Sequence, residues 1–222
     1  MNSGKTRRRE NIELWRLRPT QLTVGMLEVQ LKRKRLRELE KRPGELVDFI
    51  LEAPIRVVLG PNNKAFVIDR HHLALALLKE HFQTAPMEIE ADLSHLGKPA
   101  FWEMMQEEGF LHLFNAKGKP RPLRSLPRSL AKLKDDPYRS LAGFVRMGGG
   151  FAKSPVPYAE FQWADFFRNR IDKKSLRHDL GRAVRKCIRL ASTPAAARLP
   201  GFLGRRITRT DRANPARLQW RG

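Results

Sequence analysis

The sequence predicts a mixed α/β fold, in which a small mixed sheet is followed by a largely helical C-terminal half. Three observations support this class. Two β-branched segments flank a turn, a third segment alternates apolar with acidic residues, and helical patterns dominate after it. With 222 residues, 41% of them apolar, the chain can bury a core as one large domain or as a compact domain with an appendage.

The chain is expected to open with a flexible basic arm over residues 1–13. Residues 19–42 then indicate an extended entry followed by a helix rich in Lys and Arg, which Pro43 and Gly44 are expected to end. The stretch ELVDFILEAP predicts a short helix closed by Pro54.

The predicted sheet comes next. IRVVLG and KAFVID are separated by GPNNK, whose Gly, Pro and Asn residues favour a turn, so the two segments predict a hairpin. MEIEADL alternates in the period of a half-buried strand. Its acidic residues offer hard oxygen ligands for Mg²⁺, although a solvated strand face is the commoner outcome: Glu88, Glu90 and Asp92.

The second half is expected to be helical and to pack on the front core. The segment from Phe161 to about Ala191 predicts a long helix that could be broken once, because Leu176, Leu180, Val184 and Ile188 recur every four residues. GGGFAKS lacks the glycine that must precede the lysine of a P-loop, which excludes that motif. The predicted organisation is an arm over 1–13, a core over 14–98, a helical extension over 99–200 and a basic tail over 201–222.

Charge favours a polyanionic partner. The chain holds 44 Lys and Arg against 23 Asp and Glu, a net charge of +21, and such a field attracts nucleic acid. We expect DNA rather than RNA, no membrane partner and a cytoplasmic location, because no apolar leader or run of about 18 apolar residues occurs. The expected phosphate contacts lie at the two basic ends: Lys32, Arg33, Lys34, Arg35, Arg182, Arg185, Arg205 and Arg206.

Four charged or titratable residues lie in the turn before LALALL: Asp69, Arg70, His71 and His72. VIDRHHLALALL passes from strand to helix at Asp69, which can cap a helix. Amide groups at a helix start attract anions, His71 and His72 add donors or acid–base function, and the Arg70 fork suits phosphate. The residues therefore predict a phosphate site over Arg70, His71, His72 and Leu73. The alternative is a capped helix whose histidines pack or face water.

VIDRHHLALALL, with the upstream LRPTQLTVGMLEV, resembles the motifs of the ParB/sulfiredoxin superfamily, especially the branch called ParB-like putative nucleases. Asp69, His71 and His72 match its DGHHR-type box, while Arg70 replaces the usual glycine and Leu73 the usual arginine. The resemblance implies a sheet of ParB/sulfiredoxin type and a pocket for ATP, CTP or polynucleotide phosphates. Glu28 matches an acidic position that kinase-like relatives use near the pocket. No cysteine occurs in the box, which argues against reductase chemistry.

Together these features predict a ParB-like protein that binds nucleic acid and hydrolyses phosphodiesters or nucleoside triphosphates. His71 or His72 would act as general acid or base, and Asp69 would cap the turn or orient an imidazole. Glu28 would activate water or help to seat a divalent ion. Glu28 and Asp69 could also seat Mg²⁺. Two alternatives remain: a non-catalytic DNA-binding factor of plasmid or chromosome partitioning and maintenance, and a small-molecule kinase of the same fold.

Overall fold

The computed structural model describes residues 8–204. They fold into two compact units. The first contains the described residues through Val24 together with Glu28–Asn115 and Lys119–Lys134. The second contains Gly25–Leu27, Ala116–Gly118 and the described residues from Asp135 onward. The core boundary expected at residue 98 falls inside the first unit.

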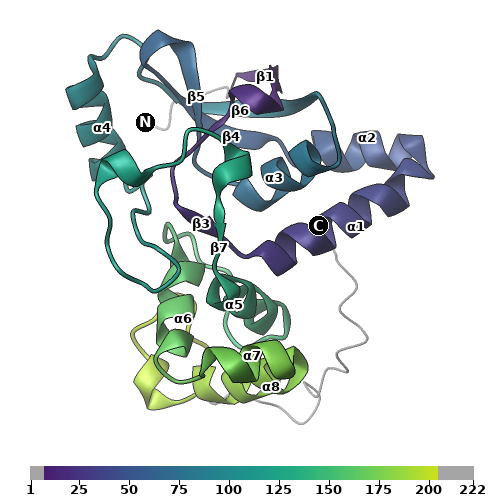
Figure 1. The fold of residues 1–222 in the computed structure, drawn as a ribbon, viewed down its shortest axis with the longest axis vertical. Helices are drawn as coiled ribbons and strands as arrows, with labels where there is room; N and C mark the ends of the chain where they lie inside the picture. The colour runs from purple at the N-terminus through teal and green to yellow at the C-terminus, as the bar shows by residue number, and fades with distance from the viewer. Residues whose placement is uncertain (1–7, 205–222) are drawn as a thin grey trace, which may run out of the picture. The chain divides into compact units, whose positions relative to one another are not determined.

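A mixed sheet organises the first unit (Figure 1). Within the described residues, five strands follow the order β1-β6-β4-β5-β2. The predicted hairpin is confirmed, since β4 and β5 pair antiparallel, and β6 runs parallel to β4 on its other side. The strands are β1 (Arg9–Glu13), β2 (Arg18–Pro19), β4 (Ile55–Gly60), β5 (Lys64–Val67) and β6 (Thr84–Asp92). Two further short strands, β3 (Thr23–Val24) and β7 (Lys134–Asp135), pair with each other.

Strand β1 differs from the sequence expectation. Residues 9–13 were expected to belong to a flexible arm, yet they pair antiparallel with β6, with Ile12 opposite Ala85. Ile12 is buried, and its alternation with charged neighbours is typical of an edge strand with one covered face. Residues 1–7 of the predicted arm lie outside the described residues.

Four α-helices are found in or reach into the described part of the first unit: α1 (Met26–Glu40), α2 (Pro43–Leu51), α3 (His71–Lys79) and α4 (Lys98–Glu107). Pro43 was expected to end a helix and instead also begins α2, because proline suits the first helical turn. Helix α3 contacts β4 and the short turns η1 (Leu14–Arg16) and η4 (Leu130–Lys132). All five of its residues from Leu73 to Leu77 are apolar and buried.

The second unit is helical, as predicted. Its helices are α5 (Pro137–Met147), α6 (Ala159–Arg168), α7 (Lys173–His178) and α8 (Leu180–Ala191), followed by η5 (Pro194–Ala196). The long helix expected over 161–191 is three helices. Aspartates cause the breaks: Asp172 Oδ1 accepts the N–H of Ser175 at 2.9 Å, and Asp179 Oδ1 accepts that of Arg182 at 2.8 Å. Both are N-cap bonds, which start a new helix.

An aromatic cluster forms the core of the described part of the second unit. Trp163 stacks on Phe151 at 4.2 Å between ring centroids and is fully buried. Leu176 is buried, and the other residues of the predicted four-residue repeat pack on this cluster: Leu180, Val184 and Ile188.

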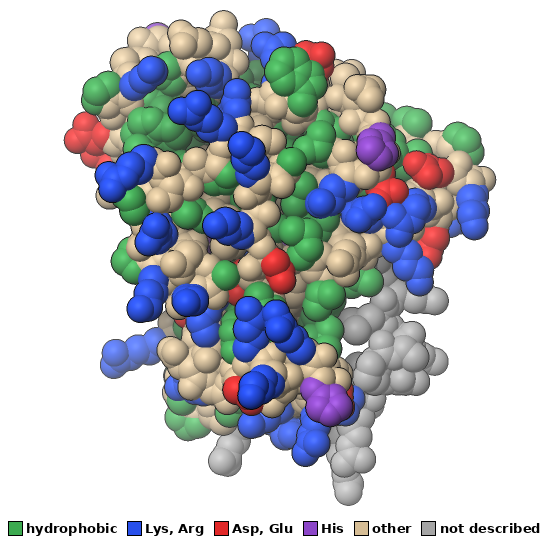
Figure 2. All heavy atoms as spheres, in the orientation of Figure 1, with side chains coloured by type: hydrophobic (Ala, Val, Ile, Leu, Met, Phe, Trp, Pro, Cys, Tyr) green, Lys and Arg blue, Asp and Glu red, His purple; other side chains and the backbone are tan. Residues whose placement is uncertain are grey.

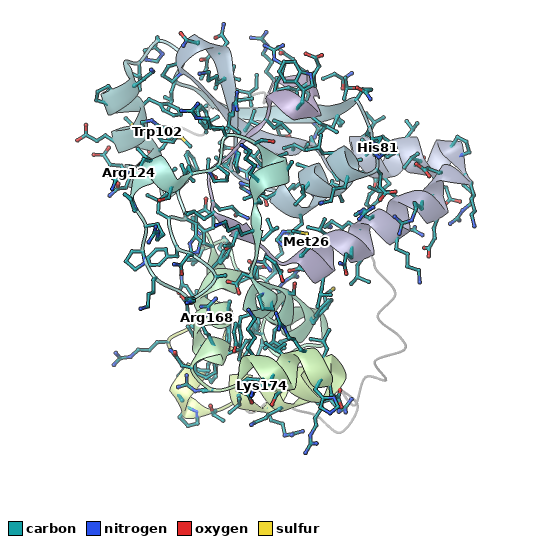
Figure 3. All side chains as sticks on the ribbon, viewed as in Figure 1. Met26, His81, Trp102, Arg124, Arg168 and Lys174 are labelled. Carbon is teal, nitrogen blue, oxygen red and sulfur yellow. The ribbon has the colours of Figure 1, made fainter. Side chains whose placement is uncertain are left out.

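Arg168, labelled in Figure 3, donates from Nη2 to Asp136 Oδ2 at 2.6 Å. None of the helices in the described part of the chain is both long and apolar enough to span a bilayer.

Candidate active site at the start of α3

The box residues lie where β5 ends and α3 begins. Arg70 is the N-cap residue and has φ +66° and ψ +28°, the left-handed conformation that glycine adopts most easily. The family box carries a glycine at this position, so the structure gives a physical reason for that glycine. Asp69 Oδ1 accepts the N–H of Arg70 at 2.7 Å. Asp69 therefore fixes the turn before α3, and it does not cap the first helical turn as expected.

His71 is a buried residue. It is 3% exposed, and its Nε2 accepts the N–H of Thr20 at 3.4 Å, with the Thr20 hydroxyl also 3.4 Å away. Thr20 is itself fully buried and donates from Oγ1 to the carbonyl of Val67 at 2.6 Å. A neutral ring that accepts at Nε2 carries its proton on Nδ1. His71 thus ties the opening segment of the chain to the end of β5.

His72 occupies a different environment. Its Nε2 lies 3.6 Å from Oε1 of Glu28, and each side chain keeps 12% of its surface exposed. Glu28 belongs to the first turn of α1, where an acidic side chain is favoured by the helix dipole. The fold therefore brings the two motifs together: the carboxylate of the opening segment meets the second histidine of the box.

The remaining box residues are placed as follows. Asp69 and Arg70 are exposed, whereas Leu73 is 3% exposed and packs in the core. Only the backbone of Leu73 could therefore contribute to the predicted phosphate site. Among the described residues, no group of three or more His, Cys, Asp or Glu side chains is placed to hold a metal ion. The metal role of Glu28 and Asp69 stays a prediction.

The acidic residues of β6 have protein partners. Glu88 lies 3.4 Å from Arg9, and Glu90 is ion-paired with Arg56. Asp92 Oδ1 accepts the N–H of Ser94 at 3.0 Å, and hydrogen bonds from Ser94 lower the pKa of this carboxyl. Ion pairing and local hydrogen bonding thus account for these carboxylates. The expected alternative to a magnesium site, a solvated strand face, fits Asp92 only, because Glu88 is buried and Glu90 is partly buried.

The predicted phosphate contacts on α1 are partly engaged within the protein. Arg33 Nε lies 2.5 Å and Arg37 Nη1 2.8 Å from Oε1 of Glu80, which sits just after α3 and is 9% exposed. Lys34 lies 4.0 Å from Glu38. Lys32 and Arg35 are half-buried on the same helix.

The predicted contacts near the C-terminus are only partly described. Arg182 and Arg185 are exposed on α8. Arg182 lines a cavity of about 460 Å³ with Arg170 and Lys186. Arg205 and Arg206 lie outside the described residues.

One functional partner was missed from sequence. Thr20 contacts His71 across 51 positions, and no local pattern reports such a pairing. The only available signal was its place in LRPTQLTV, where Thr20 and Gln21 interrupt apolar residues; both are buried. A polar pair inside an apolar segment indicates a buried hydrogen-bonding role.

Comparison with known proteins finds a matching family and a similar crystal structure. Residues 10–169 match a protein family described as "Putative ParB-like nuclease". The crystal structure of protein Atu1540 from Agrobacterium tumefaciens is similar, with 41% sequence identity and a TM-score of 0.80. That match covers 89% of this chain and 98% of the other. A search of the curated proteins finds no match.

Proposed function

The chain belongs to the ParB-like putative nuclease family, and from this premise we propose that it binds nucleic acid and hydrolyses phosphodiesters with His72 and Glu28 as its reacting pair. One observation carries the proposal. An imidazole and a carboxylate lie 3.6 Å apart, both are mostly buried, and both keep 12% of their surface open to solvent. A carboxylate that orients an imidazole is the arrangement by which proteins make a general base.

The chemistry follows from that pair. His72 accepts a proton from a water molecule as the water oxygen attacks phosphorus, and Glu28 stabilises the imidazolium that forms. The new P–O bond forms as the bond to the departing sugar oxygen breaks. The imidazolium then returns the proton to that oxygen, so His72 ends the cycle neutral. The exposed Asp69 carboxylate lies at the same turn but holds Arg70 through the backbone.

The start of α3 supplies the phosphate contacts in this scheme. First-turn amide groups point toward the helix N-terminus, where the helix dipole is positive and attracts anions. Arg70 adds an exposed guanidinium immediately before that turn. Its left-handed backbone costs about 1 kcal/mol or more, and strain of this size is typical of functional positions. His71 is a positioning residue, because its ring is held inside by Thr20.

The decisive experiment is a cleavage assay with the purified full chain. Plasmid DNA and single- and double-stranded oligonucleotides are incubated with and without Mg²⁺, which also tests the predicted ion near Glu28 and Asp69. We expect His72→Ala to lower the cleavage rate by about 100-fold or more, because a general base contributes about that much. His95→Ala, which removes an exposed histidine elsewhere in the first unit, is the matched control and should cleave normally.

Two results would contradict the proposal. Equal cleavage by the wild type and His72→Ala would show that the pair does not react. Turnover of ATP or CTP without DNA cleavage would instead assign a nucleotide hydrolase or kinase to the same pocket.

A second candidate is a non-catalytic DNA-binding factor of the partitioning or maintenance type. The burial of His71 favours it, because only one of the two box histidines then faces a substrate. The replacement of the family's arginine by the buried Leu73 also removes a cationic side chain from the box. Salt-sensitive DNA binding with no cleavage and no nucleotide turnover would select this candidate.

A further inference from the structure

A proline-rich segment of the first unit, residues 119–134, carries an uncompensated positive charge. This segment, here called the basic strap, contains no Asp or Glu. Its six cations are all exposed: Lys119, Arg121, Arg124, Arg128, Lys132 and Lys134. In the part of the chain that the structure describes, no carboxylate lies within ion-pair distance of any of them.

Apolar anchors hold the strap against the unit. Leu130 and Leu133 are 1% and 5% exposed, so the segment alternates buried leucines with outward cations. Ser129 Oγ accepts the N–H of Ala131 at 3.2 Å and caps η4, and Arg18 donates to the carbonyl of Arg128. Lys134 donates its N–H to the carbonyl of Leu22 at 3.2 Å.

Proline further restricts the backbone of the strap. The rings of Pro120, Pro122 and Pro127 each restrict the backbone angle φ to about −65°. The short turn η3 (Leu123–Ser125) lies between Pro122 and Pro127, and η4 follows Pro127. A restricted backbone loses little conformational freedom when the strap binds a ligand.

The strap passes the candidate site. Its η4 turn packs against α3, the helix that opens with His71 and His72. In Figure 1 the segment runs from the α4 side of the unit toward α3, and Figure 2 shows Lys and Arg side chains spread over that face. Arg124, labelled in Figure 3, lies on η3.

The nearby acidic residues do not neutralise the strap. Glu103 and Glu107 of α4 line a cavity of about 560 Å³ together with Leu123. Among the described residues, neither forms an ion pair with Arg124. The strap therefore keeps its positive field toward solvent. By contrast, Arg33 and Arg37 of α1 share the carboxylate of Glu80.

We infer that the basic strap is the surface that holds the phosphodiester backbone of nucleic acid, in place of α1, and that it leads the strand toward His72. This inference rests on the proposed function and adds a binding surface to it. Exposed cations that form no ion pair with a carboxylate can contact phosphates, and such contacts do not read bases. Binding should therefore be independent of sequence and steeply dependent on salt. Because Leu130 and Leu133 are buried, the strap offers few apolar groups to a lipid surface.

The test measures binding of the full chain to a fluorescent DNA duplex by anisotropy over a series of salt concentrations. The strap variant is Arg121→Gln/Arg124→Gln/Arg128→Gln. It should bind about tenfold or more weakly, and the slope of log K against log salt should fall by about 0.9 for each phosphate that is no longer neutralised. A variant with lysine at the same three positions should bind nearly as well as wild type, since the interactions are electrostatic.

The matched control removes the same charge from another exposed site. Lys173→Gln/Lys174→Gln/Arg177→Gln alters three exposed cations of α7 and should weaken binding by less than about threefold. Equal weakening by this control, or wild-type binding by the strap variant, would overturn the inference. So would strap-dependent binding to vesicles of anionic lipid with unchanged DNA binding. Circular dichroism and thermal unfolding verify that each variant is folded.

The binding and cleavage proposals can fail separately. Duplex binding is measured separately from cleavage, so the strap variant should lose affinity whether or not the protein is a nuclease. Absence of cleavage by the wild-type protein, with normal strap-dependent binding, would remove the catalytic proposal alone. Normal cleavage with strap-independent binding would remove the inference alone.

Discussion

The imidazole of His71 and the hydroxyl of Thr20 meet inside the first unit, with 3.4 Å between Nε2 and Oγ1. Replacing His71 with Ala should lower the free energy of unfolding by about 2–4 kcal/mol, because the change opens a cavity and leaves a buried partner without its hydrogen bond. Urea denaturation followed by circular dichroism measures this. His72→Ala should cost less than about 1 kcal/mol, since it changes a partly exposed side chain. Equal costs for the two variants would contradict the assignment of separate roles.

The coupling of His72 with Glu28 predicts non-additive effects on cleavage. Glu28→Gln should reduce the rate by less than His72→Ala, and the double variant should be no slower than His72→Ala alone, because the two groups act as a unit. Rates under single-turnover conditions supply the double-mutant cycle. Rate reductions that simply multiply would indicate that the residues act independently.

The left-handed backbone at Arg70 predicts a rank order of stability. Arg70→Gly should be more stable than Arg70→Ala by about 1 kcal/mol, because alanine keeps the strain that glycine relieves. Thermal unfolding of the two variants tests the order. Both should bind DNA more weakly than wild type if the guanidinium contacts phosphate. An alanine variant as stable as the glycine variant would argue against a strained turn.

Glu80 predicts an acid-sensitive contribution to stability. Burial alone would raise the pKa of this carboxyl, but hydrogen bonds from Arg33 and Arg37 lower it below its usual value. Because the pKa of Glu80 is lowered in the folded state, its contribution to the free energy of unfolding is complete above the pKa that it has in the unfolded chain. This contribution is lost as the pH falls through the pKa of the folded state. Unfolding measured from pH 7 to pH 3 should show wild type and Glu80→Gln converging at low pH. Glu45→Gln, at an exposed pair with Arg42, should cost at most about 1 kcal/mol at pH 7.

Cys187 should be chemically inert in the folded protein. It is fully buried, and burial raises the pKa of its thiol to about 12. Since the thiolate is the reactive form, a disulfide reagent added at pH 8 should titrate almost no thiol until denaturant unfolds the second unit. Rapid labelling of native protein would contradict this packing.

The sequence predicted the helices and strands whose signal lies in neighbouring residues. The β4–β5 hairpin, strand β6 and the amphipathic face of α8 all follow from apolar periodicity and turn residues. Strand β1 was missed because its charged residues resemble those of a solvated arm, and only pairing with β6 reveals the covered face. The long C-terminal helix was misjudged because Asp172 and Asp179 were not recognised as caps.

The candidate site was only partly accessible from sequence. Resemblance pointed to Glu28, His71 and His72, and the fold places His72 beside Glu28. Other features depend on residues that are distant in the chain. Thr20 is the partner of His71, which separates the environments of the two histidines. Glu80 is shared by Arg33 and Arg37. The strap went unnoticed for another reason: its signal is the absence of acidic residues over a stretch that carries no recognisable motif.

Successive residues of a helix project about 100° apart, so the repeated imidazole at positions 71 and 72 is no redundancy. The ring of His71 connects the opening segment of the chain to the start of α3. The ring of His72 keeps part of its surface open to solvent, where a substrate can reach it. His72 can consequently be substituted while His71 is kept, and the fold should tolerate a substitution of His72 far better than one of His71.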